Sequence, residues 1–169
     1  MILYLINAEH SSTNDNKTLL LELIENILAD RETEIIFLIN KFDSLEGDDI
    51  QALVDDVRKE LVELGFTTGG ILPISSNAAR LFRMAMAEEE FTKREIMDFE
   101  DMFDLFSVEK FDVAPYLETN LRNVGMMEIR DIKGIVKVGG KEYGRADLAK
   151  ASKRTGIMAV TAYVNKEIN

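Results

Sequence analysis

Short apolar runs alternate with longer stretches of helical periodicity over residues 1–87. Three runs rich in Ile and Leu have the length of strands covered on both faces of a sheet, and they occupy residues 2–6, 34–39 and 71–74. Apolar residues then recur every three or four positions, as in amphipathic helices, over residues 15–28, 50–64 and 75–87. Strands that alternate with helices across short connections are typical of a parallel sheet flanked by helices. We therefore predict an α/β core.

The second half of the chain has a different pattern. Acidic residues interleaved with Met and Phe fill residues 88–125, which we expect to form an α-helical insertion. Residues 126–169 are expected to hold a late β-hairpin, with Gly139-Gly140 as its turn, and two closing helices. These elements are placed at residues 132–143, 145–154 and 157–168. Because no repeat or low-complexity linker interrupts the sequence, we treat residues 1–169 as one domain.

Composition excludes several classes of function. The formal charge of −11 argues against non-specific binding to nucleic acid or anionic membranes, which both require a basic surface. The chain has no cysteine, so disulfides and thiolate metal sites are excluded, which fits a reducing compartment. The apolar N-terminus has no basic region before it and no cleavage site after it, unlike a signal peptide. We expect a cytoplasmic protein.

A polar tetrapeptide, Asn40-Lys41-Phe42-Asp43, follows the second apolar run. The carboxylate of Asp43 can accept hydrogen bonds from the N1 and N2 hydrogens of guanine, a pair that no other common base presents. Asn40 can bond the base and brace the loop, and the stem of Lys41 can lie along the base plane. In parallel sheets, ligands bind at such loops, at the carboxyl ends of strands. The alternative is an ordinary polar turn.

A second polar segment, Ser75-Ser76-Asn77, follows the next apolar run. It resembles the second guanine-contacting loop of GTPases. By position, Ser75 would brace Asp43, the backbone N–H of Ser76 would reach the guanine O6, and Asn77 would lie beside the base. Ser75 or Ser76 could equally serve as the N-cap of the following helix, and the two roles are compatible.

The resemblance extends to a family. Residues 3–8 (LYLINA) and 13–15 (TND) are similar to the strand and helix start that precede the guanine loop in dynamin-like GTPases. Residues 155–157 (TGI) resemble the segment that ends the GTPase domain of that family. The acidic insertion is similar to that of its bacterial members. The resemblance implies a truncated P-loop-GTPase-like sheet, in which this chain is the C-terminal half of the GTPase domain.

The parts of a GTPase that hold phosphates are missing from this sequence. Such an enzyme needs a Gly-rich loop with a Lys and a Ser or Thr, a switch Thr and an Asp-x-x-Gly turn. In the usual order these precede residue 1. GTP and Mg²⁺ are therefore expected cofactors of a complete parent protein, whereas this chain is expected to bind guanine nucleotide weakly and to hydrolyse nothing. We predict no catalytic residue and no metal ligand here.

Two late segments superficially resemble the missing parts. Residues 131–134 fit Asp-x-x-Gly, and residues 134–141 approach a phosphate loop, which would suggest a circularly permuted GTPase. We reject this interpretation because the glycine spacing is one residue too long and Glu142 replaces the required hydroxyl. The Asp-x-x-Gly sequence also comes before the loop rather than after it. A hairpin turn explains Gly139 and Gly140 fully.

The first apolar run also predicts self-association. In a complete domain of this kind it would pair with the strand that leads into the phosphate loop, so here one edge of residues 2–6 should be open. The apolar side chains beside that edge are Ile2, Leu3, Leu5 and Ile6. The alternative function is a non-catalytic protein–protein interaction module with a GTPase-like half-fold.

Other candidate residues have ordinary interpretations. We expect the lone His10 to be a loop residue and Glu88-Glu89-Glu90 to form a solvated face. Aromatic and Met side chains of the insertion could form an adaptable partner-binding face, but we favour a cover packed on the sheet or on its helices. They are Phe91, Met97, Phe99, Met102, Phe103, Phe106 and Phe111.

Overall fold

The chain divides into two compact units, Met1–Pro73 (unit 1) and Ile74–Asn169 (unit 2). The structure, a computed structural model, describes residues 2–8, 18, 21–22, 35–45, 49–65, 70–116 and 132–168. No helix within these residues is long and apolar enough to span a membrane.

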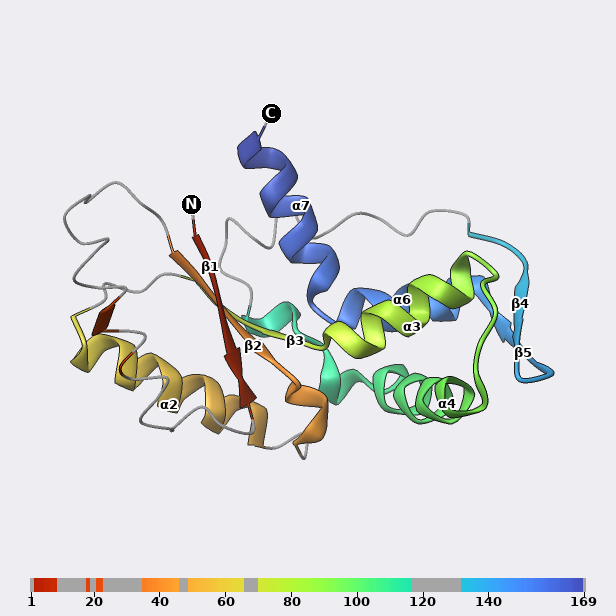
Figure 1. Cartoon of the computed structure of the whole chain (residues 1–169), viewed down its shortest axis with the longest axis horizontal. Helices are drawn as coiled ribbons and strands as arrows, with labels where there is room; N and C mark the ends of the chain where they lie inside the picture. The colour runs from red at the N-terminus through yellow and green to blue at the C-terminus, as the bar shows by residue number, and fades with distance from the viewer. Residues whose placement is uncertain are drawn as a thin grey trace. The chain divides into compact units, whose positions relative to one another are not determined.

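A parallel sheet of three strands organises unit 1 (Figure 1). Its order is β1 (Ile2–Asn7), β2 (Ile35–Asn40) and β3 (Ile71–Ile74). β1 and β2 run parallel in a register that pairs Leu3 with Ile36 and ends with Asn7 beside Asn40. Phe37 N–H donates a 2.8 Å hydrogen bond to the Gly70 carbonyl just before β3. The predicted α/β class and parallel sheet are therefore confirmed.

The central strand and one helix supply most of the core of unit 1. Every residue of β2 from Ile35 to Ile39 is buried, as the continuous apolar run predicts. The helix α2 (Asp49–Glu63) runs alongside the strands (Figure 1). It buries one face, made of Ile50, Val54, Val57 and Leu61. It stops before Gly65, whose positive φ of 90° suits a helix C-terminus.

The edge strand β1 differs from its prediction. Its apolar run was expected to be covered on both faces, but the burial alternates along the strand. Tyr4 and Ile6 face the core, where the Tyr4 ring lies 5.9 Å from that of Phe37. Leu3 and Leu5 are 40% and 59% exposed. The prediction is wrong for this face because composition cannot distinguish a strand with one exposed face from a strand with none.

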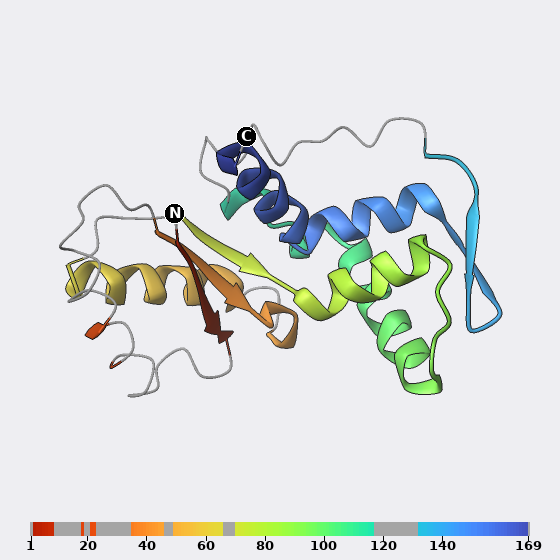
Figure 2. The ribbon, with the colours of Figure 1, turned by 45° about the horizontal axis from the view of Figure 1, so that its top comes forward.

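Unit 2 is a group of helices with a hairpin at one end (Figure 2). Its helices are α3 (Ser76–Met86), α4 (Lys93–Ser107), α6 (Arg145–Arg154) and α7 (Ile157–Ile168). Short 3₁₀ turns follow α4 at Glu109–Phe111 and Ala114–Tyr116. The antiparallel hairpin consists of β4 (Ile135–Val138) and β5 (Lys141–Gly144). α3, α4 and α6 contact one another, and the hairpin contacts α3 and α6.

Aromatic rings fill the space between these helices. Phe82 of α3 meets Phe99, Phe103 and Phe106 of α4 edge-to-face, at centroid distances of 5.9, 6.4 and 6.1 Å. Tyr143 of the hairpin packs 5.0 Å from both Phe99 and Phe103. The aromatic side chains of the insertion thus form a cover packed on helices, as favoured from the sequence. Met97, by contrast, is 67% exposed.

Two arginines at the ends of α6 bind the C-termini of neighbouring helices. Arg145 donates to the Met86 carbonyl at the end of α3 and pairs with the carboxylate of Glu88. Arg154 donates to the carbonyls of Phe106 and Ser107, at 3.0 and 2.8 Å. Each cation satisfies carbonyl groups that a helix end leaves without partners and favours the negative end of the helix dipole. These bonds fasten α6 to α3 and α4.

Most predicted boundaries of unit 2 agree with the structure. Both closing helices match, with Gly156 between them at φ 80°. The hairpin turns at Gly139 and Gly140, but β4 begins at Ile135 rather than at residue 132. Glu88, Glu89 and Glu90 are exposed, as expected. His10, Asp131, residues 117–125 of the insertion and nearly all of the helix predicted over residues 15–28 lie outside the described residues.

Candidate functional site

The first predicted guanine loop is a tight turn at the carboxyl end of β2. Asn40 ends the strand, Lys41 adopts the left-handed conformation (φ 67°, ψ 29°), and Phe42–Ser44 form one 3₁₀ turn. Ser44 holds the turn by donating from its N–H and its hydroxyl to the Lys41 carbonyl, at 3.1 and 2.7 Å. Phe42 is fully buried and anchors the loop to the core. These hydrogen bonds and the buried Phe42 side chain hold the loop in this conformation.

Asp43 has an unusual environment in this turn. The residue is half-buried, and its Oδ1 is buried without a hydrogen-bond partner among the described residues. Buried carboxylate oxygens nearly always accept a hydrogen bond, because leaving one unpaired costs the desolvation energy of the group. Among the described residues the hydrogen-bonding capacity of this oxygen is unused, and the turn has to open for a ligand to reach it.

The left-handed backbone conformation of Lys41 is unfavourable for a lysine. Non-glycine residues rarely adopt positive φ, and such strain concentrates at functional sites. The Lys41 side chain is exposed, as a stem that covers a flat ligand must be. Asn40 is flanked by Asn7, its register partner at the end of β1, so two side-chain amides lie side by side at this edge of the sheet.

The second predicted guanine loop begins unit 2. Ser75 is fully buried, and its hydroxyl accepts a 3.3 Å hydrogen bond from Ala78 N–H, so it is the N-cap of α3. Its own N–H donates 2.9 Å to the carbonyl of Thr155 at the end of α6. Ser76 and Asn77, by contrast, are exposed in the first turn of the helix. The N-cap interpretation of Ser75 is confirmed, and its bracing role toward Asp43 remains a prediction.

A network that the sequence did not predict surrounds Asn77. Arg80 Nη2 lies 3.4 Å from the Asn77 side-chain oxygen, and Arg80 Nη1 donates 2.8 Å to Glu95 of α4. Glu95 in turn accepts from the N–H and the hydroxyl of Thr92, which completes a capping box. The hydrogen bond from Arg80, followed by those from Thr92, lowers the pKa of Glu95 to about 2. In the sequence, the only indication of this network is the T-x-x-E pattern of residues 92–95, which is typical of a capping box.

The predicted site residues therefore fall into two groups. Asn40, Lys41 and Asp43 come together in one turn of unit 1, and Ser75, Ser76 and Asn77 in the first turn of unit 2. Within the described residues, no three carboxylate or His side chains gather as metal ligands do.

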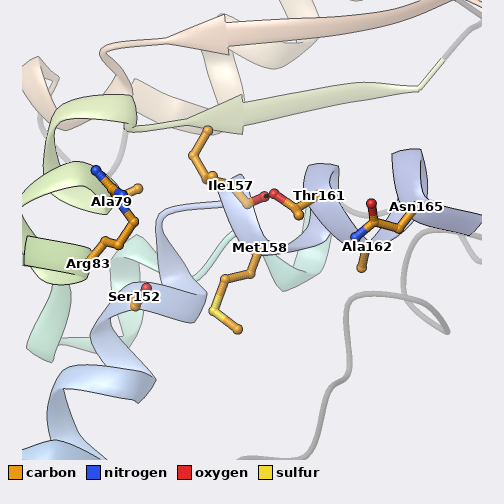
Figure 3. A pocket seen from close by; sticks show the side chains of 8 residues that line it. All are labelled: Ala79, Arg83, Ser152, Ile157, Met158, Thr161, Ala162 and Asn165. Carbon is orange, nitrogen blue, oxygen red and sulfur yellow. Dashed lines mark hydrogen bonds between the residues drawn. The ribbon is translucent and has the colours of Figure 1, made fainter. Parts of the chain in front are cut away.

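A separate groove of about 310 Å³ lies in unit 2 (Figure 3). Ala79 and Arg83 of α3, Ser152 of α6 and one face of α7 line it. The α7 residues are Ile157, Met158, Thr161, Ala162 and Asn165. The groove contains none of the predicted guanine-loop residues.

Comparisons with known proteins add no relative. No protein-family model matches the chain, and neither the curated proteins nor the solved structures yield a significant match.

Proposed function

We propose that this chain recognises guanine through the Asn40–Asp43 turn, as the base-reading half of a dynamin-like GTP-binding protein. The observation that carries the proposal is the buried, unpartnered oxygen of Asp43 at the carboxyl end of a parallel strand. Ligand sites of open parallel sheets lie at this end. The sequence order of the two polar loops adds support.

The chemistry of the turn favours guanine over other bases. The two carboxylate oxygens of Asp43 accept from the N1 hydrogen and the N2 amino group, a pair that adenine does not offer. The exposed stem of Lys41 covers the base plane, and Asn40 bonds the base edge. Within unit 2, Ser75 fixes the start of α3 as its N-cap and leaves Ser76 and Asn77 exposed in the first turn.

Binding by these contacts alone is expected to be weak. In nucleotide-binding proteins, phosphates are held by a Gly-rich loop and a Mg²⁺ ion, and the 169 residues contain no such loop. GTP with Mg²⁺ is the ligand proposed for a protein that also carries those parts.

The test is a titration followed by two-dimensional NMR of the ¹⁵N-labelled chain. Guanosine monophosphate should shift the amides of Lys41, Asp43 and Ser44, and adenosine monophosphate should leave them in place. Asp43→Asn should transfer the response to xanthosine monophosphate, whose 2-oxo group needs a donor. Asp56→Asn, at an exposed site on α2, is the matched control and should keep the preference for guanine. Equal shifts with the adenine nucleotide, or none with guanine at millimolar concentration, would contradict the proposal.

A second candidate function is protein–protein interaction. The observation that favours it is the exposed apolar face of β1, where Leu5 is 59% exposed. The two functions are compatible, because the guanine turn follows β2 and the exposed face belongs to β1.

A further inference from the structure

β1 is the edge of the parallel sheet. In the order β1-β2-β3, its only neighbour among the described strands is β2. A strand in this position directs alternate backbone N–H and C=O groups away from the sheet, where another strand can bind them. Natural proteins protect such edges with charges, prolines or bulges. The β1 sequence ILYLIN contains no charge and no proline, and its pairing with β2 is continuous.

The exposed side chains of β1 are arranged symmetrically about Tyr4. Leu3 and Leu5 are exposed on one face, whereas Tyr4 between them faces the core. In an antiparallel pair centred on Tyr4, Leu3 of one strand lies opposite Leu5 of the other, on the same face of the sheet. A second copy of β1 therefore matches each exposed leucine with another one. Neighbouring leucines of the two copies then cover each other.

We propose that two copies of this chain pair antiparallel through β1, with the two-fold axis at Tyr4. The partner is a second copy because this register sets the exposed leucines of the two strands opposite each other and brings no charged side chain of β1 into the pair. The contact is isologous and closes after two copies, as most homodimers do. The chain carries a net charge of −11, and an uncharged strand is a place where two such chains meet without facing like charges. The proposal does not depend on guanine recognition.

Sedimentation equilibrium tests the dimer. The wild type should be dimeric at micromolar concentration. Leu5→Lys should raise the dissociation constant about a hundredfold, since the axis counts each substitution twice and replacing a leucine–leucine contact by a lysine beside leucine costs about tenfold. Val62→Lys is the matched control, because Val62 is 55% exposed on α2 of the same unit. It should leave the dimer intact. Circular dichroism checks that each variant is folded.

Disulfide trapping tests the register. The chain has no cysteine, so single replacements introduce the only thiols. Directly opposed residues in antiparallel strands have Cα atoms about 4.5–5.5 Å apart, which is within the reach of a disulfide. Residues offset by two positions lie farther apart, beyond that reach. A mixture of Leu3→Cys and Leu5→Cys chains should form the mixed disulfide, and neither variant alone should cross-link efficiently. A monomeric wild type, a dimer unaffected by Leu5→Lys, or preferential Leu3→Cys homodimers would overturn the proposal.

Discussion

The guanidinium of Arg80 in α3 donates a 2.8 Å hydrogen bond to the carboxylate of Glu95 in α4. Arg80 also reaches the side-chain oxygen of Asn77, and Glu95 caps its own helix through Thr92. The start of the acidic insertion is thereby joined to the second proposed guanine loop. A substitution at Glu95 is therefore expected to alter the position of the Arg80 side chain and, through it, the surroundings of Asn77.

The low pKa of Glu95 predicts a pH-dependent contribution to stability. Its folded value of about 2 lies below the ordinary 4.5, so the ionised carboxylate stabilises the fold above pH 4.5. That contribution is lost as the pH falls from 4.5 toward 2. The difference in free energy of unfolding between wild type and Glu95→Gln, measured by urea denaturation, should therefore be constant above pH 5 and shrink on acidification. A difference that does not change between pH 5 and pH 3 would contradict this assignment.

Arg154 is predicted to need its guanidinium, not only its charge. Its Nη1 donates to two carbonyls at the end of α4, and the ammonium of a lysine, one bond shorter and without the fixed plane of the guanidinium, does not reach the same point. Arg154→Lys should lower the free energy of unfolding by about 1–2 kcal/mol. Arg94→Lys, where the side chain is 90% exposed, is the control and should change it by less than about 0.5 kcal/mol. An equal effect of both substitutions would mean that the carbonyl contacts contribute nothing.

Lys41 should show a trade-off between stability and ligand binding. Its φ of 67° strains a lysine but suits glycine, so Lys41→Gly should raise the free energy of unfolding by about 0.5–1 kcal/mol. Under the proposed function, the same change should weaken binding of guanosine monophosphate because the stem over the base is lost. Lys41→Asn separates the two effects, since asparagine tolerates this conformation but lacks the stem. Unchanged binding in both variants would remove Lys41 from the site.

Gly139 and Gly140 should respond differently to alanine. Both have positive φ, and a Cβ at Gly139 would lie 2.5 Å from Ile96 Cγ2, whereas none would meet an atom within 4 Å at Gly140. Gly140→Ala should therefore show only backbone strain, about 1–2 kcal/mol. Gly139→Ala should lose about 1–3 kcal/mol more through the clash. Thermal unfolding measures both, and Ile96→Ala should restore most of the excess at Gly139 alone.

GTP hydrolysis by this chain should equal the buffer background. No Gly-rich phosphate loop occurs in the sequence to orient the γ-phosphate. The measurement is phosphate release from Mg²⁺–GTP over hours, with Asp43→Ala as the comparison. Turnover that survives repeated purification and disappears in Asp43→Ala would reveal a phosphate site that the sequence pattern does not contain.

The elements that could be predicted are those with a strong local period. α2, α3 and the closing helices followed from apolar spacing, and the hairpin followed from its two glycines. The exposure of Leu3 and Leu5 did not, because a run of apolar residues carries no information about which face is covered. Burial depends on neighbours supplied by distant segments.

The candidate site was predictable only as far as it depends on local sequence. The types of residue in the Asn40–Asp43 turn led to the prediction of a base-binding loop. Their position after a strand correctly placed them at the carboxyl end of β2, the end at which parallel sheets bind ligands. The left-handed Lys41 and the unpartnered oxygen of Asp43 are properties of the folded backbone. The hydrogen bonds of Arg80 and Arg154 join segments that are separated in the chain, so no local sequence pattern predicts them.

The hydrogen bond from Ser75 N–H to the Thr155 carbonyl brings the entrance of unit 2 next to the junction of its last two helices. The chain between these two residues, which includes α4 and the hairpin, is thus a long excursion whose two ends meet at this hydrogen bond. Doubling the length of such a loop costs only about 0.6 kcal/mol in closure entropy. Insertions in an exposed turn of this excursion, such as residues 88–90, therefore cost little closure entropy while Ser75 and Thr155 keep their places. Unit 2 can thus accept a longer exposed turn at residues 88–90 without disturbing the cap of α3.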